Sequence, residues 1–131
     1  MRKSAILAVA LALVPAQAYC QAPNAAVMNL EFSWVGTTAC SPRSPAFTVR
    51  NVPAGTTVLD FTMTDLNVPS FAHGGGRIAY AGNSNIPQGA FTYVGPCPPR
   101  ETHNYQWTVT ALSAAGAVLG RAAAVRPFPP R

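Results

Sequence analysis

The chain has 131 residues, of which 49% are hydrophobic and only 10% are charged, and its formal net charge is +5. This length fits a single domain. Beyond Lys3 every basic residue is an arginine, and these arginines are scattered singly along the chain. Nucleic-acid binding requires a basic stripe, so we expect no nucleic-acid partner and at most a mild attraction for anions.

The N-terminal segment predicts a secretory signal peptide at residues 1–18. Arg2 and Lys3 precede an apolar run that ends at Pro15 and the small-residue motif Ala16-Gln17-Ala18. The run is too short to span a bilayer, which takes roughly 20 residues. We expect cleavage after this motif, with a signal at 1–22 as the alternative. The mature protein is then periplasmic or secreted and does not span the membrane.

Apolar and polar residues alternate with a period of two in the segments 30–34, 59–63 and 105–111, which predicts half-buried antiparallel strands. Shorter candidate strands are 46–51, 77–81, 90–93 and 118–125. Clusters of Pro, Gly, Asn and Ser separate these segments, and no stretch of the mature sequence has convincing helical periodicity. The pattern predicts an all-β sandwich or barrel.

We expect a single β-domain at residues 29–126, preceded by a lead-in at 19–28. Residues 127–131 follow as a Pro-rich tail. Because proline has no N–H to donate, this tail is predicted to be extended or frayed rather than a strand.

Two of the cysteines, Cys40 and Cys97, lie in the body of the domain. Export into an oxidising compartment predicts a disulfide between them, and buried free thiols are the alternative. Cys20, if the mature chain retains it, is left over.

Asp65 and His103 stand out among the few ionisable residues. Asp65 follows an alternating strand and begins a turn sequence that Pro69 stiffens. If that strand pairs antiparallel with the one beginning at Tyr105, the end of the first meets the start of the second, and Asp65 and His103 converge. The alternatives are an aspartate that caps its own turn and a loop histidine that bonds a carbonyl group.

The stretch His73-Gly74-Gly75-Gly76 is the other candidate element. Glycines tolerate positive φ, so successive backbone N–H groups can face one point and bind an anion. An ordinary flexible loop is the alternative.

Several motifs between Cys40 and Leu112 together resemble the phosphatidylethanolamine-binding protein family, in particular its bacterial Raf-kinase-inhibitor-like members. They are Cys40-Ser41 followed by Ser44-Pro45-Ala46-Phe47, Val52-Pro53-Ala54-Gly55-Thr56, Asp65-Leu66-Asn67-Val68-Pro69, and Tyr93 to Pro99 followed by His103-Asn104-Tyr105. The Gly-Pro-Cys-Pro-Pro element with the following His-x-Tyr is the most specific. The resemblance implies a small antiparallel β-sandwich with a pocket for phosphate-containing head groups and other small anions.

The resemblance also implies roles for individual residues. Asp65 matches the first aspartate of the family's Asp-Pro-Asp-x-Pro motif. His103 and Tyr105 match the histidine and tyrosine of its His-Arg-Tyr motif. Gly95 and Pro96 match residues that form the wall of the family's pocket.

The chain departs from the family pattern at several positions. Asn67 replaces the second aspartate, and Asn104 replaces the arginine after the histidine. The second pocket histidine corresponds to His73 or, when the following strand is aligned, to a glycine such as Gly75. The chain is also shorter than usual members and shows no C-terminal helix.

We therefore expect an exported binding protein, not an enzyme, that takes a small anion or a phospholipid head group and needs no metal or cofactor. In this hypothesis His103 donates to an anionic oxygen, Asp65 orients the imidazole, and amides of the glycine loop assist. A pocket of this kind needs few polar groups. The polar, threonine-rich strand faces favour a monomer.

Other function classes have weaker support. The resemblance is also compatible with a protein-interaction or protease-inhibitor module that binds no ligand. A blue-copper-like site could use His73, Cys97 and His103, but no methionine follows His103, and a disulfide would remove the thiolate. A hydrolase is disfavoured because the sequence has no Gly-x-Ser-x-Gly or His-Glu-x-x-His motif.

Overall fold

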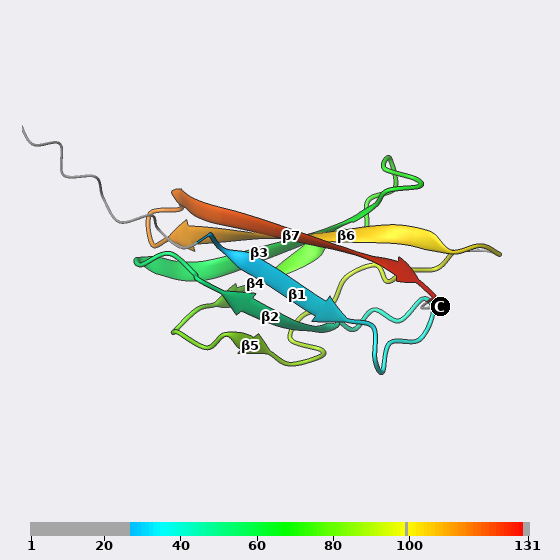
Figure 1. Cartoon of the computed structure of the whole chain (residues 1–131), viewed down its shortest axis with the longest axis horizontal. Coiled ribbons are helices and arrows are strands. Elements are labelled where there is room, and N and C mark those ends of the chain that lie inside the picture. Colours follow the sequence, from blue (N-terminus) through cyan, green and yellow to red (C-terminus); the bar gives the residue numbers. More distant parts are fainter. Residues whose placement is uncertain (1–26, 99, 130–131) are drawn as a thin grey trace, which may run out of the picture.

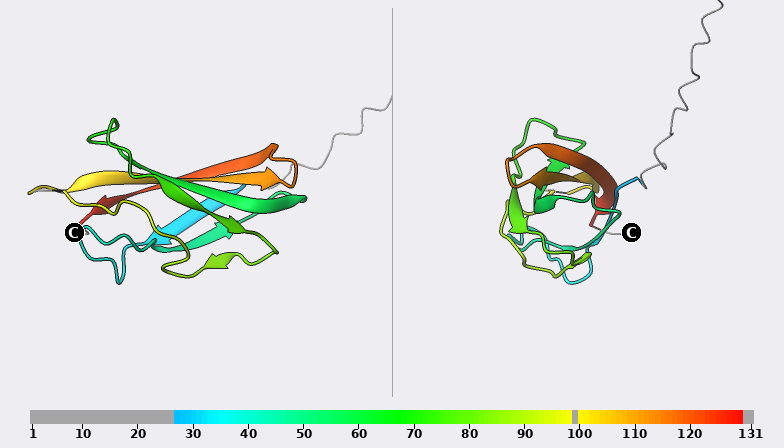
Figure 2. Two further views of the ribbon diagram at one scale, coloured as in Figure 1. Left: turned by 180° about the vertical axis from the view of Figure 1, so that it is seen from behind. Right: turned by 90° about the vertical axis from the view of Figure 1, so that its left-hand side faces the viewer.

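The computed structural model describes residues 27–98 and 100–129. Its strands are β1 (Asn29–Ser33), β2 (Ala46–Arg50), β3 (Thr56–Asp65), β4 (Gly75–Ala79), β5 (Asn85–Ile86), β6 (His103–Ser113) and β7 (Val118–Phe128). They form two antiparallel sheets, ordered β1-β2-β5 and β4-β3-β6-β7, which face each other (Figure 1 and Figure 2). The prediction of an all-β, antiparallel, sandwich-like fold is confirmed. The predicted signal peptide lies outside the described residues.

The core fills the space between the sheets with the inward-facing half of each alternating strand. On β6, Trp107 and Val109 are fully buried, while Thr108 between them is only partly buried. Phe47 of β2 packs against Phe61 of β3 and against Trp107, at ring-centroid distances of 4.5 and 5.1 Å. Aromatic rings contribute much of the apolar area that stabilises so small a domain. No helix in the described part of the chain is long and apolar enough to cross a membrane.

The pairing of β3 with β6 positions the candidate site. The register places Asp65, the last residue of β3, opposite Tyr105 near the start of β6. Just beyond β3, the N–H of Leu66 donates to the carbonyl of Asn104 at 2.8 Å. The antiparallel pairing expected from the sequence is therefore confirmed.

The end of β7 differs from the prediction of a tail beginning at residue 127. The strand continues through Pro127 to Phe128, which pairs with His103 and is buried against Trp34. Pro127 is tolerated because β7 is the edge strand of its sheet, where a missing N–H breaks no second ladder. Burial of Phe128 thus outweighs the low strand propensity of the prolines around it.

Two shorter elements also differ from the prediction. The expected strand at 90–93 is reduced to an isolated bridge between Thr92 and Arg43, because its partner is an irregular segment that contains prolines. Conversely, Asn85 ends a Gly/Asn/Ser cluster that separates two expected strands, yet it forms β5 together with Ile86, since Ile86 enters the core opposite Phe47 of β2.

Three loops gather at one end of the sandwich, where β1 and β3 end and β6 begins. They are 34–45, 66–74 and the described residues of 87–98 and 100–102, and they lie together at the right-hand end of Figure 1. Loops carried by a rigid scaffold are the usual location of binding sites.

Candidate functional site

Asp65 and His103 form a hydrogen-bonded pair at this end of the sandwich. Oδ2 of Asp65 lies 2.6 Å from Nδ1 of His103, and the two side chains are only 6% and 8% exposed. The pair forms because adjacent antiparallel strands bring the last residue of β3 beside the first residue of β6. The convergence predicted from strand pairing is therefore observed.

The second carboxylate oxygen of Asp65 organises the following loop. Oδ1 accepts the backbone N–H groups of Asn67 and Val68 at 2.8 and 3.2 Å. Asp65 is thus both the turn cap that was considered as an alternative and the partner of His103. Burial alone would raise the pKa of Asp65, but the hydrogen bonds from His103 and from these amides outweigh burial and hold that pKa below its usual value.

Asn67 extends this arrangement. Its side-chain oxygen accepts the N–H of Asn104 at 2.8 Å, so the residue in place of the family's second aspartate joins the loop after β3 to the start of β6. An amide performs this task without placing a second negative charge beside Asp65.

The environment of His103 favours its charged form. The hydrogen bond that His103 donates to Asp65 raises the pKa of His103; burial opposes the increase, and the negative charges of Asp65 and Glu101 add to it. With Nδ1 engaged by Asp65, Nε2 is the ring atom that remains for a ligand. The nearest carboxylate to Nε2 is that of Glu101, at 3.7 Å on an exposed side chain.

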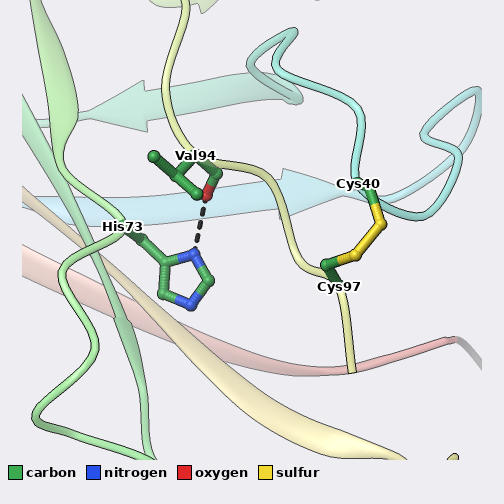
Figure 3. Close-up of a disulfide and its surroundings, with 4 residues drawn as sticks. All are labelled: Cys40, His73, Val94 and Cys97. Carbon is green, nitrogen blue, oxygen red and sulfur yellow. Dashed lines mark hydrogen bonds between the residues drawn. A yellow bond between two sulfur atoms is a disulfide. The ribbon is translucent and has the colours of Figure 1, made fainter. Parts of the chain in front are cut away.

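His73 is the second imidazole of the site. It is 4% exposed, and its Nδ1 donates to the carbonyl of Val94 at 2.6 Å, as Figure 3 shows. Its ring packs against Phe71 and Tyr105 at centroid distances of 4.6 and 5.5 Å. Because Nδ1 faces a carbonyl it carries the proton, which leaves Nε2 as the second ring nitrogen for polar contacts.

Tyr105 lies between the two histidines. Its ring stacks against that of His103 at 6.1 Å and meets that of His73 nearly at right angles. Burial, followed by the negative charge of Asp65, raises the pKa of Tyr105 to about 12. Tyr105 therefore remains a neutral phenol that holds both imidazoles in place.

These residues surround a cavity of about 190 Å³. Its lining combines the acid and the two imidazoles with apolar loop residues: Asp65, Val68, Phe71, His73, Val94, Gly95, Cys97, Pro98, His103 and Tyr105. The cavity is small and mostly apolar, with a few convergent polar groups, which is the usual composition of a small-molecule site.

Five of the seven predicted ligand-binding residues line this cavity, namely Asp65, His73, Gly95, His103 and Tyr105. Pro96 does not line it. This residue is fully buried behind the cavity wall, and its carbonyl accepts the N–H of Cys40 at 2.8 Å. Its role is to support the wall from behind.

Gly75 is also absent from the lining, and the predicted anion-binding glycine loop is wrong. Gly75 and Gly76 belong to β4 and pair with β3. A Cβ on Gly75 would collide with the carbonyl of Phe61, and one on Gly76 would collide with the ring of Phe91. These glycines are required for close packing, so their amides are not gathered around a ligand.

The predicted disulfide between Cys40 and Cys97 is present, and it forms part of the cavity wall (Figure 3). It leaves no thiolate at Cys97 for a copper ion. Among residues 27–98 and 100–129, no group of three or more His, Cys, Asp or Glu side chains is arranged to hold a metal. The blue-copper hypothesis therefore has no site in this part of the chain.

Sequence reasoning missed the apolar wall of the cavity, which is made of Val68, Phe71, Val94 and Pro98. The available signal was the presence of large apolar residues within polar, Pro-rich loops. Val68, Phe71 and Val94 are 41–51% exposed, which is unusual for three such side chains that lie together.

A larger hollow lies elsewhere on the surface. It is an open groove of about 670 Å³ across β1, β2 and β5, with Glu31 and Arg126 among its lining residues. Glu31 is paired with Arg50, and Arg126 lies over the ring of Phe32. No buried ionisable group faces this groove, so the smaller histidine cavity is the better candidate.

The family follows from comparison of the whole sequence. A model of the family named phosphatidylethanolamine-binding protein matches residues 21–128. The chain belongs to this family. The match covers nearly all of the described residues, including every residue that lines the histidine cavity.

Two solved structures share this fold. A phosphatidylethanolamine-binding protein homologue, CT736 from Chlamydia trachomatis, is 18% identical with a TM-score of 0.60, over 80% of this chain and 99% of that chain. YbcL from Escherichia coli, described as a member of the mammalian family, is 20% identical with a TM-score of 0.54, over 69% of this chain and 82% of that chain. At these identities the likeness concerns the fold. A search of curated proteins finds no match.

Proposed function

We propose that this member of the phosphatidylethanolamine-binding protein family is an exported, monomeric protein that binds a small anion, either free phosphate or a phosphorylated head group. The observation that carries the proposal is the His103 imidazole, which Asp65 holds at Nδ1 with a raised pKa at the edge of a mostly apolar cavity. A protonated imidazole held in this way presents Nε2–H to an incoming anion.

The electrostatics favour a single anionic group. Asp65 balances the charge of protonated His103 before the ligand arrives, so the cavity is stable when empty. The anion then receives a charge-assisted hydrogen bond, which is worth about 1.5–3 kcal/mol in proteins. The apolar wall of Val68, Phe71 and Val94 strengthens this interaction by lowering the local dielectric constant.

The composition of the cavity supports binding rather than catalysis. Its lining residues include no serine, no threonine and no free thiol, so the hydroxyl and thiol nucleophiles of most hydrolases are missing from the lining. We therefore assign no enzymatic activity to the site.

The test is a titration of the oxidised mature protein with inorganic phosphate and with glycerophosphoethanolamine, followed by NMR of both histidine rings. We expect saturable shifts at His103 and His73 in the wild-type protein, and loss of the His73 shifts in His103→Gln. Arg126→Gln, which removes a cation from the larger groove, is the matched control and keeps the binding. Unperturbed histidine signals, or binding that is lost in Arg126→Gln instead, would contradict the proposal.

The exposed apolar side chains around the cavity mouth favour a second candidate function. Val68, Phe71 and Val94, which line the cavity, are 41–51% exposed. Such a patch beside a cavity is typical of protein-binding surfaces, and a protease inhibitor would present it to its target. The test is inhibition of a panel of serine proteases by the wild-type protein and by Phe71→Ser. Inhibition that the substitution abolishes would support this function, and no inhibition would exclude it for that class.

A further inference from the structure

One wall of the histidine cavity is a loop rather than a strand. The segment 94–98 supplies Val94, Gly95, Cys97 and Pro98 to the lining, yet it belongs to neither sheet. The position of this wall therefore depends on a few individual contacts.

The first half of the wall is held from two sides. The N–H of Val94 donates to the carbonyl of His73 at 2.9 Å, and the His73 ring returns a hydrogen bond to the carbonyl of Val94. On the other side, Gly95 packs directly on the backbone of Ser41, where a Cβ would collide with the Ser41 carbonyl.

The second half of the wall is held differently. The carbonyl of Pro96 accepts the N–H of Cys40, but within the described residues no backbone hydrogen bond joins Cys97 or Pro98 to another part of the chain. The disulfide is the link that fixes Cys97, and it connects this residue to the loop at 34–45 (Figure 3).

This disulfide is open to reagents, since both Cys40 and Cys97 are exposed. Cys40 also has a φ of 62°, a left-handed conformation that is disfavoured for a residue with a Cβ. Release of the sulfur link therefore removes a constraint from a backbone that prefers to relax.

We propose that the Cys40–Cys97 disulfide is a redox switch for the anion cavity, an inference that rests on the proposed binding function. A dithiol reductant attacks one sulfur, forms a mixed disulfide with it, and releases the other cysteine as a thiol. The second thiol of the reductant then displaces the remaining cysteine. Two electrons and two protons pass to Cys40 and Cys97, and the dithiol becomes a disulfide.

The two redox states differ in the wall. In the oxidised state, Cys97 and Pro98 are held as part of the cavity wall. In the reduced state Cys97 and Pro98 are free to move, while the hydrogen bonds of Val94 with His73 keep the first half in place. Ligand binding must then order the second half of the wall, which lowers the affinity.

The experiment measures phosphate binding by NMR on the mature protein carrying Cys20→Ser, so that two cysteines remain. We expect the Kd for inorganic phosphate to rise about tenfold on reduction with dithiothreitol, the cost of ordering one or two side chains. Removal of the reductant in air restores the affinity. The core amides of Trp107 and Val109 stay unshifted, because only the wall is released.

The matched control is the double variant Cys40→Ser with Cys97→Ser. It should bind phosphate as weakly as the reduced protein, and its Kd should not change on addition of dithiothreitol. Equal affinity of the oxidised and reduced proteins would overturn the switch and leave the proposed function intact. Loss of the core amide signals on reduction would also overturn it, because the disulfide would then stabilise the whole domain. Failure of the oxidised protein to bind phosphate would instead refute the binding function on which the switch depends.

Discussion

Replacement of Phe128 by alanine tests whether the end of β7 belongs to the core. Phe128 is 4% exposed and packs against Trp34 at a centroid distance of 5.2 Å. Truncation of a buried phenylalanine to alanine costs about 3–5 kcal/mol, because apolar burial is lost and a cavity remains. We expect a value near the lower limit, about 3 kcal/mol, since residues at the end of an edge strand can relax around the cavity.

The measurement is urea denaturation followed by tryptophan fluorescence, with the free energy of unfolding compared between variants. Val125→Ala is the matched control, because Val125 lies on the same strand but is 49% exposed. The control should change the free energy of unfolding by less than about 0.5 kcal/mol. A loss for Phe128→Ala as small as that of the control would refute the packing argument and restore the interpretation of a frayed tail.

Three further predictions concern the site and its scaffold. Asp65→Asn lowers the pKa of His103, measured by NMR titration of the ring, because the largest cause of its elevation is removed; an unchanged pKa would contradict the pairing. The His103 contribution to wild-type stability is complete below its ordinary pKa of 6.5 and is lost as pH rises through the raised value, whereas the Asp65 contribution is present above 3.8 and is lost as pH falls through the lowered value. The urea midpoint should therefore be highest between pH 3.8 and pH 6.5, and it should decline at higher pH and at lower pH. A midpoint that does not change with pH would exclude the linkage. Gly76→Ala forces a Cβ against the ring of Phe91 and costs about 1–3 kcal/mol; wild-type stability would show that the ring moves freely.

Much of the fold and the centre of the site were accessible from the sequence. The alternating patterns of β3 and β6 predict both strands, and antiparallel pairing of two such strands places Asp65 beside His103. The pairing of Cys40 with Cys97 was accessible because these are the two cysteines in the body of the predicted domain. Each of these inferences depends on the local pattern and on one long-range pairing.

The glycine loop shows where local reasoning fails. Three consecutive glycines satisfy the backbone requirement for an anion nest, but they satisfy equally well the requirement for a strand that passes close to Phe61 and Phe91. The neighbours that distinguish these uses are distant in the sequence. A local pattern cannot contain that information.

The sequence by itself determined the all-β class, the antiparallel strands of the centre, and the convergence of Asp65 with His103, because side-chain periodicity and turn chemistry act between close neighbours. Only the tertiary structure decided that His73 faces the same cavity as His103, that Val94 and Phe71 form its wall, and that Phe128 completes the core. These outcomes depend on burial of side chains from segments that are distant in the sequence and come into contact only in the folded chain. Free energy from such packing overrides local propensity wherever the two disagree.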